Sequence, residues 1–586
     1  MFDLMTNKLD RLVVLQSKAQ SEHYQNTRRM DGDIVLPIGP EAMYETDING
    51  WAFCTLGDLW SGDQLEKEKN VIQKRLDDLI ETLNDYSRRW NPELGLEIGN
   101  YYAFQLWVII NQIQYNNFFV RCIAENIKPS KILCYTKAKA QVFMELRPDP
   151  DCLFADVLSR SALWKNGICE IVRINENDKI NTLREIVLAA LPVSVRAILR
   201  KIRDKNGLKS THSATYNLLI IGAGGDWIKL SNYSDFVKEF RLHLPPELIS
   251  ADKVKPEEEL SDIISNSIQR DGLVPFDISG LASAIQSDLH LFAKKAEEIR
   301  DMMMNYDAIV TSVLTFPRDN FLAHIAALVG RPVVVWQHGE KGQSGLDPVG
   351  IYTELFYATD YFAYAPVVVK QYEAFLGKYR LNSVVAVGSI EKNVVWQGGN
   401  TIVYATGKWF KNGLLSDPDR RLYEAHKSIL GYLENIGNRY SIIMKANNTP
   451  GLNDIPYRLN KVDVEYVKPF TELLKTAKIV ILDTPATTLI EACSTKIPIF
   501  VLGGRTEYTH EFLLVIKRRV VWSETPEDLV RHIATFLEAG TYNADVNDQT
   551  FLLQYGAGTK ATQVVKTARA CLLDSINYSN SLNQQL

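Results

Sequence analysis

The chain has 586 residues, too many for one hydrophobic core, so its length predicts three or four structural units. Hydrophobic residues make up 46% and charged residues 23%, as in an ordinary globular protein. The net charge of −5 argues against nucleic-acid binding through an overall positive field, and leaves open only a local basic groove.

The seven cysteines form no CxxC pair and have mostly apolar neighbours, which predicts reduced, buried thiols in a cytoplasmic protein. Residues 1–10 lack a basic region followed by an apolar core, so no secretion signal is expected. The best apolar run, Tyr101 to Ile110, is too short to span a membrane. We therefore expect a cytoplasmic protein, with peripheral attachment to the inner face of the membrane as the alternative.

The first part of the chain is interpreted as partly helical or loose. Residues 1–30 are polar, and residues 31–62 are rich in Gly, Asp, Trp and Pro, which is typical of irregular structure. Apolar residues recur at helical spacing from 65 to 89. We predict an N-terminal helical or irregular extension over residues 1–95.

From residue 96 to 390, strands and helices alternate, which predicts a Rossmann-like lobe with a parallel sheet covered on both faces. Long helices are expected at 97–126, 179–204 and 279–304, and the charged region 233–275 is interpreted as an insertion or flap. The expected strands are 131–135, 168–174, 216–222, 308–313, 332–337 and 383–387.

The alternation starts again after Gly388 and a linker to Asn400, which predicts a second Rossmann-like lobe over residues 400–545. The C-terminal tail, 546–586, is expected to be helical and to pack back on the first lobe. The fold class is therefore α/β, with two facing Rossmann-like lobes and a cleft between them. The expected strands of the second lobe are 401–406, 440–445, 462–466, 479–482 and 497–502.

The stretch from Lys478 to Leu502 carries the most informative pattern. An apolar strand ends at Asp483, Thr484 stands where a helix N-cap belongs, and Pro485 stands at the first helical position. Hydroxyls and a carboxylate then gather near the predicted helix start, where a phosphate could bind. The alternative is a capped structural helix.

Three further strand ends carry polar residues. One is a glycine loop, Gly222, Gly224 and Gly225, that leads to Asp226. Another is His338, followed by Gly339, Glu340 and Lys341, and a third is Lys445 with Asn447. Each of these three motifs also has a purely structural explanation: a tight turn for the glycine loop, a hydrogen-bonded residue for His338, and a solvated cap for Lys445 and Asn447. The glycine loop lacks the GxGxxG pattern of a dinucleotide site.

The order of these motifs resembles that of bacterial surface-polysaccharide transferases of GT-B fold, especially those that use CMP-Kdo or similar CMP-ulosonic donors. Poly(glycerol phosphate) transferases are more distant. The resemblance covers about half of the chain. The matching motifs are Gln337-His338-Gly339 with Gly342 and Gly345, Gly388, the Gly-x-Gly-x-Asp-Trp run at 222–227, the Asp483-x-Pro485-x-Thr487-Thr488-x-x-Glu491-Ala492 box, and Phe551 with Tyr555-Gly556. Asn448-Thr449-Pro450 departs from the His-Pro pair of such enzymes.

The resemblance implies an inverting, metal-independent transferase that moves a sugar, Kdo or another ulosonic acid, onto a bacterial cell-surface glycan or glycolipid. It implies no cofactor beyond the nucleotide-sugar donor, and no nucleic-acid partner. Asp226 is the preferred catalytic base and His338 the second. The expected binding residues are Gly222, Gly224, Gly225, Gly339, Glu340, Lys341, Lys445, Asn447, Asp483, Thr484, Thr487, Thr488 and Glu491, with no metal ligands. The alternatives are a transferase of glycerol or ribitol phosphate from a CDP-alditol, and a non-catalytic GT-B scaffold.

Overall fold

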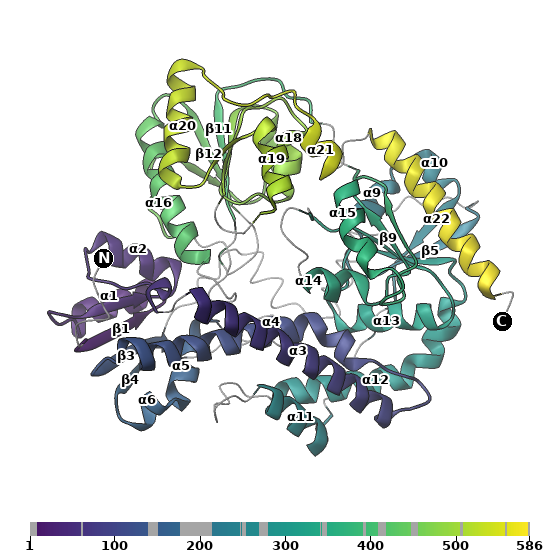
Figure 1. Cartoon of the computed structure of the whole chain (residues 1–586), viewed down its shortest axis with the longest axis horizontal. Helices are drawn as coiled ribbons and strands as arrows, with labels where there is room; N and C mark the ends of the chain where they lie inside the picture. The colour runs from purple at the N-terminus through teal and green to yellow at the C-terminus, as the bar shows by residue number, and fades with distance from the viewer. Residues whose placement is uncertain are drawn as a thin grey trace.

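Three parallel β-sheets with helices around them organise the molecule (Figure 1). Two sheets have six strands and the third has four. The computed structural model describes residues 9–59, 62–138, 150–175, 214–246, 248, 254–268, 279–339, 341–342, 348–390, 394–407, 409, 418–446, 455–503, 508–556 and 560–583. The predicted helix at 179–204 lies outside these residues.

The first lobe is a sheet in the order β10-β9-β8-β7-β5-β6. Its β-branched strand residues are buried on both faces, as a parallel sheet between helices requires. The edge strand β6 falls inside the region interpreted as an insertion or flap, so that interpretation was wrong. The strands are β5 (Tyr216–Ile220), β6 (Phe240–His243), β7 (Ala308–Thr311), β8 (Val333–Trp336), β9 (Asp360–Ala363) and β10 (Ser383–Ala386). The helices are α9 (Gly225–Leu230), α10 (Ser234–Val237), α13 (Pro317–Leu328), α14 (Pro348–Gly350) and α15 (Pro366–Tyr372), with η3 (Ile351–Leu355) and η4 (Glu373–Phe375).

The second lobe repeats this plan in the order β13-β12-β11-β14-β15-β16. Its predicted strands are confirmed, and β16 is added at the edge. The strands are β11 (Thr401–Ala405), β12 (Ser441–Lys445), β13 (Asp463–Glu465), β14 (Ala477–Leu482), β15 (Ile499–Leu502) and β16 (Val521–Ser523). The helices are α16 (Pro418–Ile436), α17 (Phe470–Leu474), α18 (Thr487–Cys493), α19 (His510–Arg519) and α20 (Pro526–Ala539).

The N-terminal region forms a third α/β domain, so the expectation of a helical or irregular extension was wrong. Its strands, in the order β2-β1-β3-β4, are all parallel. The sheet crosses the expected domain boundary at residue 95, because β3 and β4 come from the segment assigned to the first lobe. The strands are β1 (Arg11–Leu15), β2 (Ile34–Pro37), β3 (Lys131–Lys137) and β4 (Cys169–Ile174), and the helices are α1 (Lys18–Thr27), α2 (Pro40–Ile48), η1 (Leu56–Asp58), α5 (Pro150–Arg160) and α6 (Ala162–Lys165).

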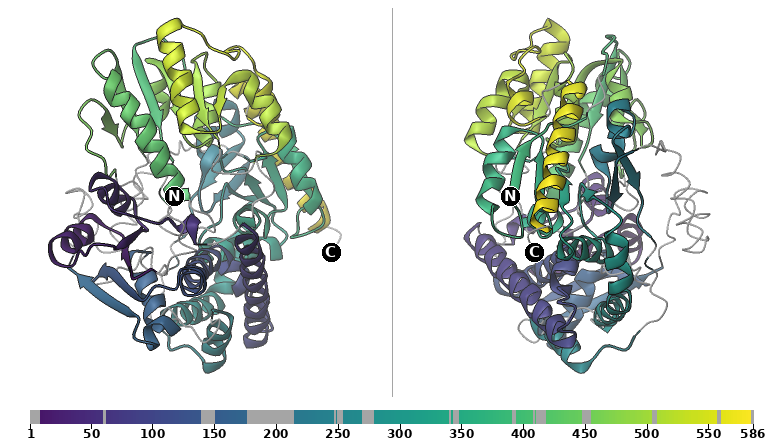
Figure 2. Two further views of the ribbon diagram at one scale, coloured as in Figure 1. Left: turned by 60° about the vertical axis from the view of Figure 1, so that its left-hand side comes forward. Right: turned by 90° about the vertical axis from the view of Figure 1, so that its right-hand side faces the viewer.

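A layer of long helices joins this third domain to the first lobe (Figures 1 and 2). Helix α3 has a buried apolar stripe that includes Leu76, Leu79 and Leu83, and the stripe packs on α4. Because α4 is apolar around most of its surface, it is buried among α3, α5, α11 and α13. The helices of the layer are α3 (Gly62–Trp90), α4 (Ile98–Cys122) with the π-helical turn η2 (Ile123–Ile127), α11 (Glu258–Ile268) and α12 (Ser279–Met303).

The third domain also contacts the second lobe, through α2 and α16 (Figure 1). Asp47 accepts hydrogen bonds from Tyr423 Oη at 3.1 Å and Lys427 Nζ at 2.8 Å. Met43 packs there with Trp409 and Tyr423 in a small apolar cluster. The third domain therefore touches the second lobe directly, and is joined to the first through the helical layer.

The linker between the six-stranded lobes is anchored at both ends. Trp336 of the first lobe donates a hydrogen bond from Nε1 to Gly388 O at 2.9 Å. Trp396 donates from Nε1 to Ala477 O of the second lobe at 2.8 Å. The two lobes have separate sheets, as the break in the alternation predicted. These two hydrogen bonds hold Gly388 to the first lobe and Trp396 to the second.

The C-terminal tail crosses back between the lobes. Helix α21 (Thr550–Gln554) belongs to the second-lobe core through Phe551 and Leu552. Helix α22 (Ala561–Asn583) lies along the first lobe in Figures 1 and 2, where Val564 and Leu572 enter its core. The expected return of the tail to the first lobe is confirmed.

The described helices do not combine the length and apolar character needed to cross a bilayer. All seven cysteines are free, four of them buried and three part-buried. Burial raises the pKa of the Cys54 thiol to about 12, which keeps that thiol protonated and unreactive at neutral pH.

His324, on α13, makes the fold sensitive to acid. Its side chain is buried beside Tyr101 Oη of α4, and burial lowers its pKa to about 4. The unfolded chain binds a proton at this histidine near pH 6.5, whereas the folded chain does not, so stability falls as the pH drops from about 6.5 to about 4. We expect a loss of about 3 kcal/mol over that range. Urea unfolding at several pH values measures it, and a His324→Gln variant whose pH dependence matched the parent would contradict it.

Candidate functional site

Both six-stranded sheets have a topological switch point, where neighbouring strands lead the chain in opposite directions. In the first lobe it lies between β5 and β7, and in the second between β11 and β14. Ligands of open α/β sheets bind beyond the carboxyl ends of the strands at such points. The two candidate edges are therefore the loops that follow these four strands.

The C-terminal edges of the two lobes meet. A Cβ atom placed on Gly339, in the loop after β8, would lie 3.5 Å from Thr487 Oγ1 at the start of α18. A Cβ on Gly342, in the same loop, would lie 3.6 Å from Tyr555 Cδ1. The structure thus brings together Gly339 and Thr487, which lie in different lobes and were both predicted to bind substrate or donor.

The glycine loop of the first lobe packs closely against the loop after β7. Gly222 and Gly225 have positive φ angles of +58° and +45°. A Cβ on Gly222 would lie 2.3 Å from Val313 O, and one on Gly225 would lie 2.2 Å from Ser312 Oγ. A Cβ on Gly224 would meet Ile228 at 2.5 Å. Packing and backbone geometry therefore account for all three glycines without a ligand.

Asp226 is enclosed rather than open to an acceptor. Its side chain is 1% exposed and forms an ion pair with Lys229 Nζ at 2.5 Å. Its Oδ2 accepts a hydrogen bond from the Ile390 N–H, in the linker, at 3.3 Å. In this arrangement Asp226 fastens the linker to the first lobe, and the geometry favours a structural role over the expected catalytic one.

Asp319 is a carboxylate at this switch point that the sequence reasoning missed. It lies in the first turn of α13, just after β7, and is half-buried. Its surroundings remove most of its water, which raises the pKa of the carboxyl to about 6, against the smaller opposing effects of Gly222 and Arg318. The signal was present as an acidic residue at a helix start after a buried strand, in Pro317-Arg318-Asp319.

His338 is exposed at the end of the neighbouring strand, β8. The preceding Gln337 holds this loop: its Oε1 accepts from Tyr364 N at 2.8 Å, and its Nε2 donates to Gly339 O at 2.8 Å. Glu340 lies outside the described residues. Lys341 pairs through Nζ with the buried Glu354 Oε1 at 3.1 Å, which holds it against the first lobe.

Asp483, at the second switch point, is completely buried and organises the loop after β11. It accepts hydrogen bonds from Tyr404 Oη at 2.7 Å, Thr406 Oγ1 at 2.6 Å and Gly407 N at 2.7 Å. His426 Nε2 lies 3.3 Å away. Asp483 therefore holds the loop after β11 in place from within the core. This differs from the direct contact with the donor that was expected for it.

Helix α18 begins at Thr487, with Ala486 as its N-cap. The predicted start at Thr484 and Pro485 was therefore two residues early. The Thr484 hydroxyl is 3.1 Å from Asp483 Oδ1 and donates to it, so it does not cap the helix. Thr487 is exposed at the edge, and Thr488 and Glu491 are half-buried along the same helix.

Lys445, at the end of β12, donates from Nζ to Tyr466 O at 2.7 Å. Burial lowers its pKa, and the nearby Glu465 partly opposes that change. The lysine thus ties β12 to the loop after β13 at the same edge of the second lobe. Asn447 lies outside the described residues.

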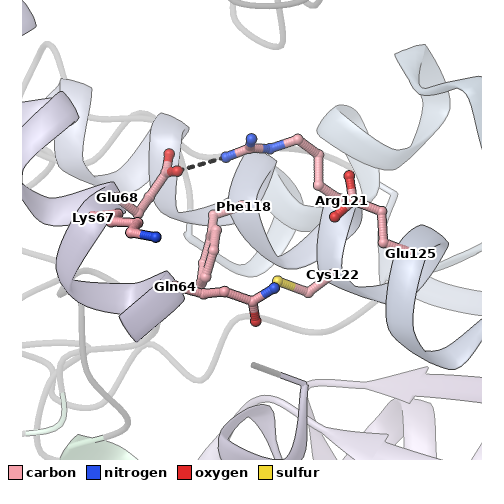
Figure 3. Close-up of a pocket in the computed structure, with 7 residues that line it drawn as sticks. All are labelled: Gln64, Lys67, Glu68, Phe118, Arg121, Cys122 and Glu125. Carbon is pink, nitrogen blue, oxygen red and sulfur yellow. Dashed lines mark hydrogen bonds and ion pairs between the residues drawn. The ribbon is translucent and has the colours of Figure 1, made fainter. Parts of the chain in front are cut away.

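A hollow of about 170 Å³ lies between α3 and α4, away from the strand ends (Figure 3). Arg121 and Glu68 form an ion pair of 2.7 Å beside it. It is lined by Gln64, Lys67, Glu68, Phe118, Arg121, Cys122 and Glu125. In the part of the chain that the structure describes, no three His, Cys, Asp or Glu side chains are placed to hold a metal ion.

Two Rossmann-like domains, joined by a linker and apposed at the carboxyl ends of their strands, define the GT-B fold, and the chain has that fold. The third α/β domain and the helical layer are additions to it.

Solved structures of the same architecture share little sequence with this chain. No protein-family model and no curated protein matches it. A UDP-N-acetylglucosamine 2-epimerase from Rickettsia bellii aligns at 14% identity over 63% of this chain and 98% of its own, with a TM-score of 0.37. A glycosyltransferase from Rickettsia africae aligns at 10% identity over 62% and 99%, with a TM-score of 0.35. MurG from Acinetobacter baumannii aligns at 10% identity over 62% and 99%, with a TM-score of 0.28.

Proposed function

We propose that this protein is an inverting, metal-independent glycosyltransferase that uses a nucleotide-sugar donor to extend a bacterial cell-surface glycan or glycolipid. The observation that carries the proposal is the meeting of the two strand edges at Gly339 and Thr487. A donor held on one edge and an acceptor held on the other would be brought together there, which lowers the entropic cost of their reaction.

The donor is assigned to the second lobe. We assign its phosphate to the hydroxyls of Thr487 and Thr488, in the first turn of α18, and its ribose hydroxyls to Glu491, one turn further along. Asp483 would act indirectly, by holding Gly407 and Thr406 in place. The resemblance of the Asp483–Ala492 box to that of CMP-ulosonic acid transferases leads us to propose a CMP-linked donor such as CMP-Kdo.

A nucleotide panel tests the donor class. Melting temperatures are measured with CMP, CDP, UDP and GDP at equal concentrations, since a ligand that binds the folded state raises its apparent stability. A shift with CMP supports the proposal. Hydrolysis of CDP-glycerol without hydrolysis of a CMP-sugar would favour the alditol-phosphate alternative, and no shift with any nucleotide would favour the non-catalytic scaffold.

Thr487→Ala and Thr488→Ala together are expected to weaken binding of that nucleotide at least tenfold and to leave the fold intact. Each lost hydrogen bond to a charged phosphate is worth about 1.5–3 kcal/mol. Calorimetric titration measures the change. Thr535→Ala, on α20, is the matched control, because that hydroxyl bonds only its own helix, at Arg531 O. If the folded double variant binds the nucleotide as tightly as the parent, α18 has a structural role and does not bind the phosphate.

A further inference from the structure

We propose that the third domain positions the donor loop of the second lobe, and that Asp47 is the positioning residue. The donor loop is the segment after β11 that contains Thr406, Gly407 and Trp409. This inference rests on the proposed function, which assigns the donor to this edge of the second lobe. It gives a part in donor binding to a domain that lies outside the two GT-B lobes.

The third domain is fixed to the first lobe by a shared core. One cluster of buried side chains runs from β1 through α3 and α4 to β7, and it includes Leu12, Leu76, Ile109 and Ile309. Packed interiors of this kind resist deformation. The first lobe therefore sets the position of the third domain, and the contact of that domain with the second lobe bridges the two lobes.

Charged and aromatic groups make this contact, where α2 lies beside α16 (Figure 1). Asp47 of α2 accepts from Tyr423 Oη at 3.1 Å and from Lys427 Nζ at 2.8 Å, both on α16. The Arg420 guanidinium, on the same helix, lies 4.9 Å from the ring centroid of Phe53 and 5.5 Å from that of Tyr423. One face of α16 thus carries two cations toward the third domain, and Asp47 binds one of them.

Trp409 brings the donor loop into the same contact. It packs with Met43 of α2 and Tyr423 of α16 in one apolar cluster, and it is 1% exposed. Its ring centroid also lies 5.2 Å from that of His426, with the two rings at 78°. A residue of the donor loop, two positions after Gly407, is therefore buried against the third domain.

His426 connects α16 to the other end of the donor loop. It is three residues after Tyr423 on the helix and is completely buried, and its Nε2 lies 2.5 Å from Thr406 Oγ1. Because Thr406 donates its own hydrogen to Asp483 Oδ2 at 2.6 Å, the histidine N–H donates to Thr406. The position of α16 therefore sets that of Thr406, and Asp47 ties α16 to the third domain.

The local setting of Asp47 shows that its own helix does not need it. It stands in the last turn of α2, where the helix dipole disfavours a carboxylate and favours a cation. The side chains of Asp47 and Lys427 are 31% and 59% exposed, so their ion pair adds little to the stability of the fold. Replacement of Asp47 therefore separates the contact between the domains from folding.

The test is calorimetric titration of the Asp47→Lys variant with CMP, CDP, UDP and GDP. The new cation suits the end of α2 but repels Lys427, so the contact with α16 is expected to open. We expect the nucleotide that binds the parent to bind at least about fivefold more weakly, with the melting temperature almost unchanged. Asp235→Lys, beside Lys238 in an exposed pair on α10, is the matched control and should keep the affinity of the parent.

Two further measurements distinguish positioning from a general structural role. Asp47→Lys combined with Lys427→Asp restores opposite charges across the contact, and is expected to recover most of the lost affinity. Coupling between two sites is reciprocal, so bound nucleotide should also slow hydrogen exchange of the α2 amides in the parent. It should not slow that exchange in the Asp47→Lys variant.

A folded Asp47→Lys variant that binds the nucleotide as tightly as the parent overturns the inference and leaves the proposed function standing. A parent that binds none of the four nucleotides overturns both. Should Asp47→Lys fail to fold, Lys427→Gln removes the same ion pair from the exposed side. The same titration then decides, and unchanged affinity again overturns the inference.

Discussion

Replacement of Asp483 by asparagine is expected to lower the free energy of unfolding by about 3–5 kcal/mol, the cost of breaking a buried charged network. The carboxylate accepts from three donors within 2.7 Å, and an amide NH₂ would face at least one of them with a second donor. The variant should also lose nucleotide affinity, because Gly407 and Thr406 form the loop at the proposed donor edge. Urea unfolding and calorimetric titration measure the two effects.

Tyr404→Phe provides the matched comparison, since it removes one of the donors and leaves the carboxylate in place. It should cost about 1 kcal/mol, and the double variant should cost less than the sum of the single changes, because the two groups are direct partners. Asp235→Asn, at a carboxylate that is 71% exposed on α10, should leave stability almost unchanged. An Asp483→Asn protein as stable as the parent would mean that Asp483 does not hold this loop.

The strands of the two large lobes could be predicted because each is a short apolar, β-branched run closed by a turn residue. Ile479 to Leu482 and Val333 to Trp336 are of this kind, and burial on both faces preserves the pattern. The restart after Gly388 likewise predicted two sheets. Local sequence is enough where burial alone decides the secondary structure.

The third domain was missed although its first strand carried the same signal. Arg-Leu-Val-Val-Leu at 11–15 is an apolar run followed by Ser17, which caps α1. Its partner β2, Ile34–Pro37, has four residues and ends in proline, and the rest of the sheet comes from beyond residue 130. A strand whose neighbours are separated by a long helical hairpin cannot be assigned to a sheet from local pattern.

The site residues show where local reasoning ends. Asp226, Asp319 and Asp483 each follow a strand or begin a helix, and sequence position alone makes them equivalent. Their roles differ because of distant partners: Ile390 reaches Asp226 from the linker, and Tyr404 of β11 and Thr406 of the following loop reach Asp483. Contacts with residues distant in sequence therefore determine which carboxylate is enclosed and which remains at the edge of the sheet.

Asp226→Ala is expected to separate a structural carboxylate from a catalytic one. It removes the acceptor of the Ile390 N–H and the partner of Lys229, and leaves a buried backbone donor unsatisfied, which should cost about 2–3 kcal/mol of stability. Lys229 is half-exposed and can regain water, so it adds little to that cost. Turnover of the folded fraction should remain within about tenfold of the parent, because Asp226 has no path to an acceptor. Melting temperature and single-turnover rate, measured on one preparation, decide the matter. A variant as stable as the parent but slower by a hundredfold or more would return the role of base to Asp226.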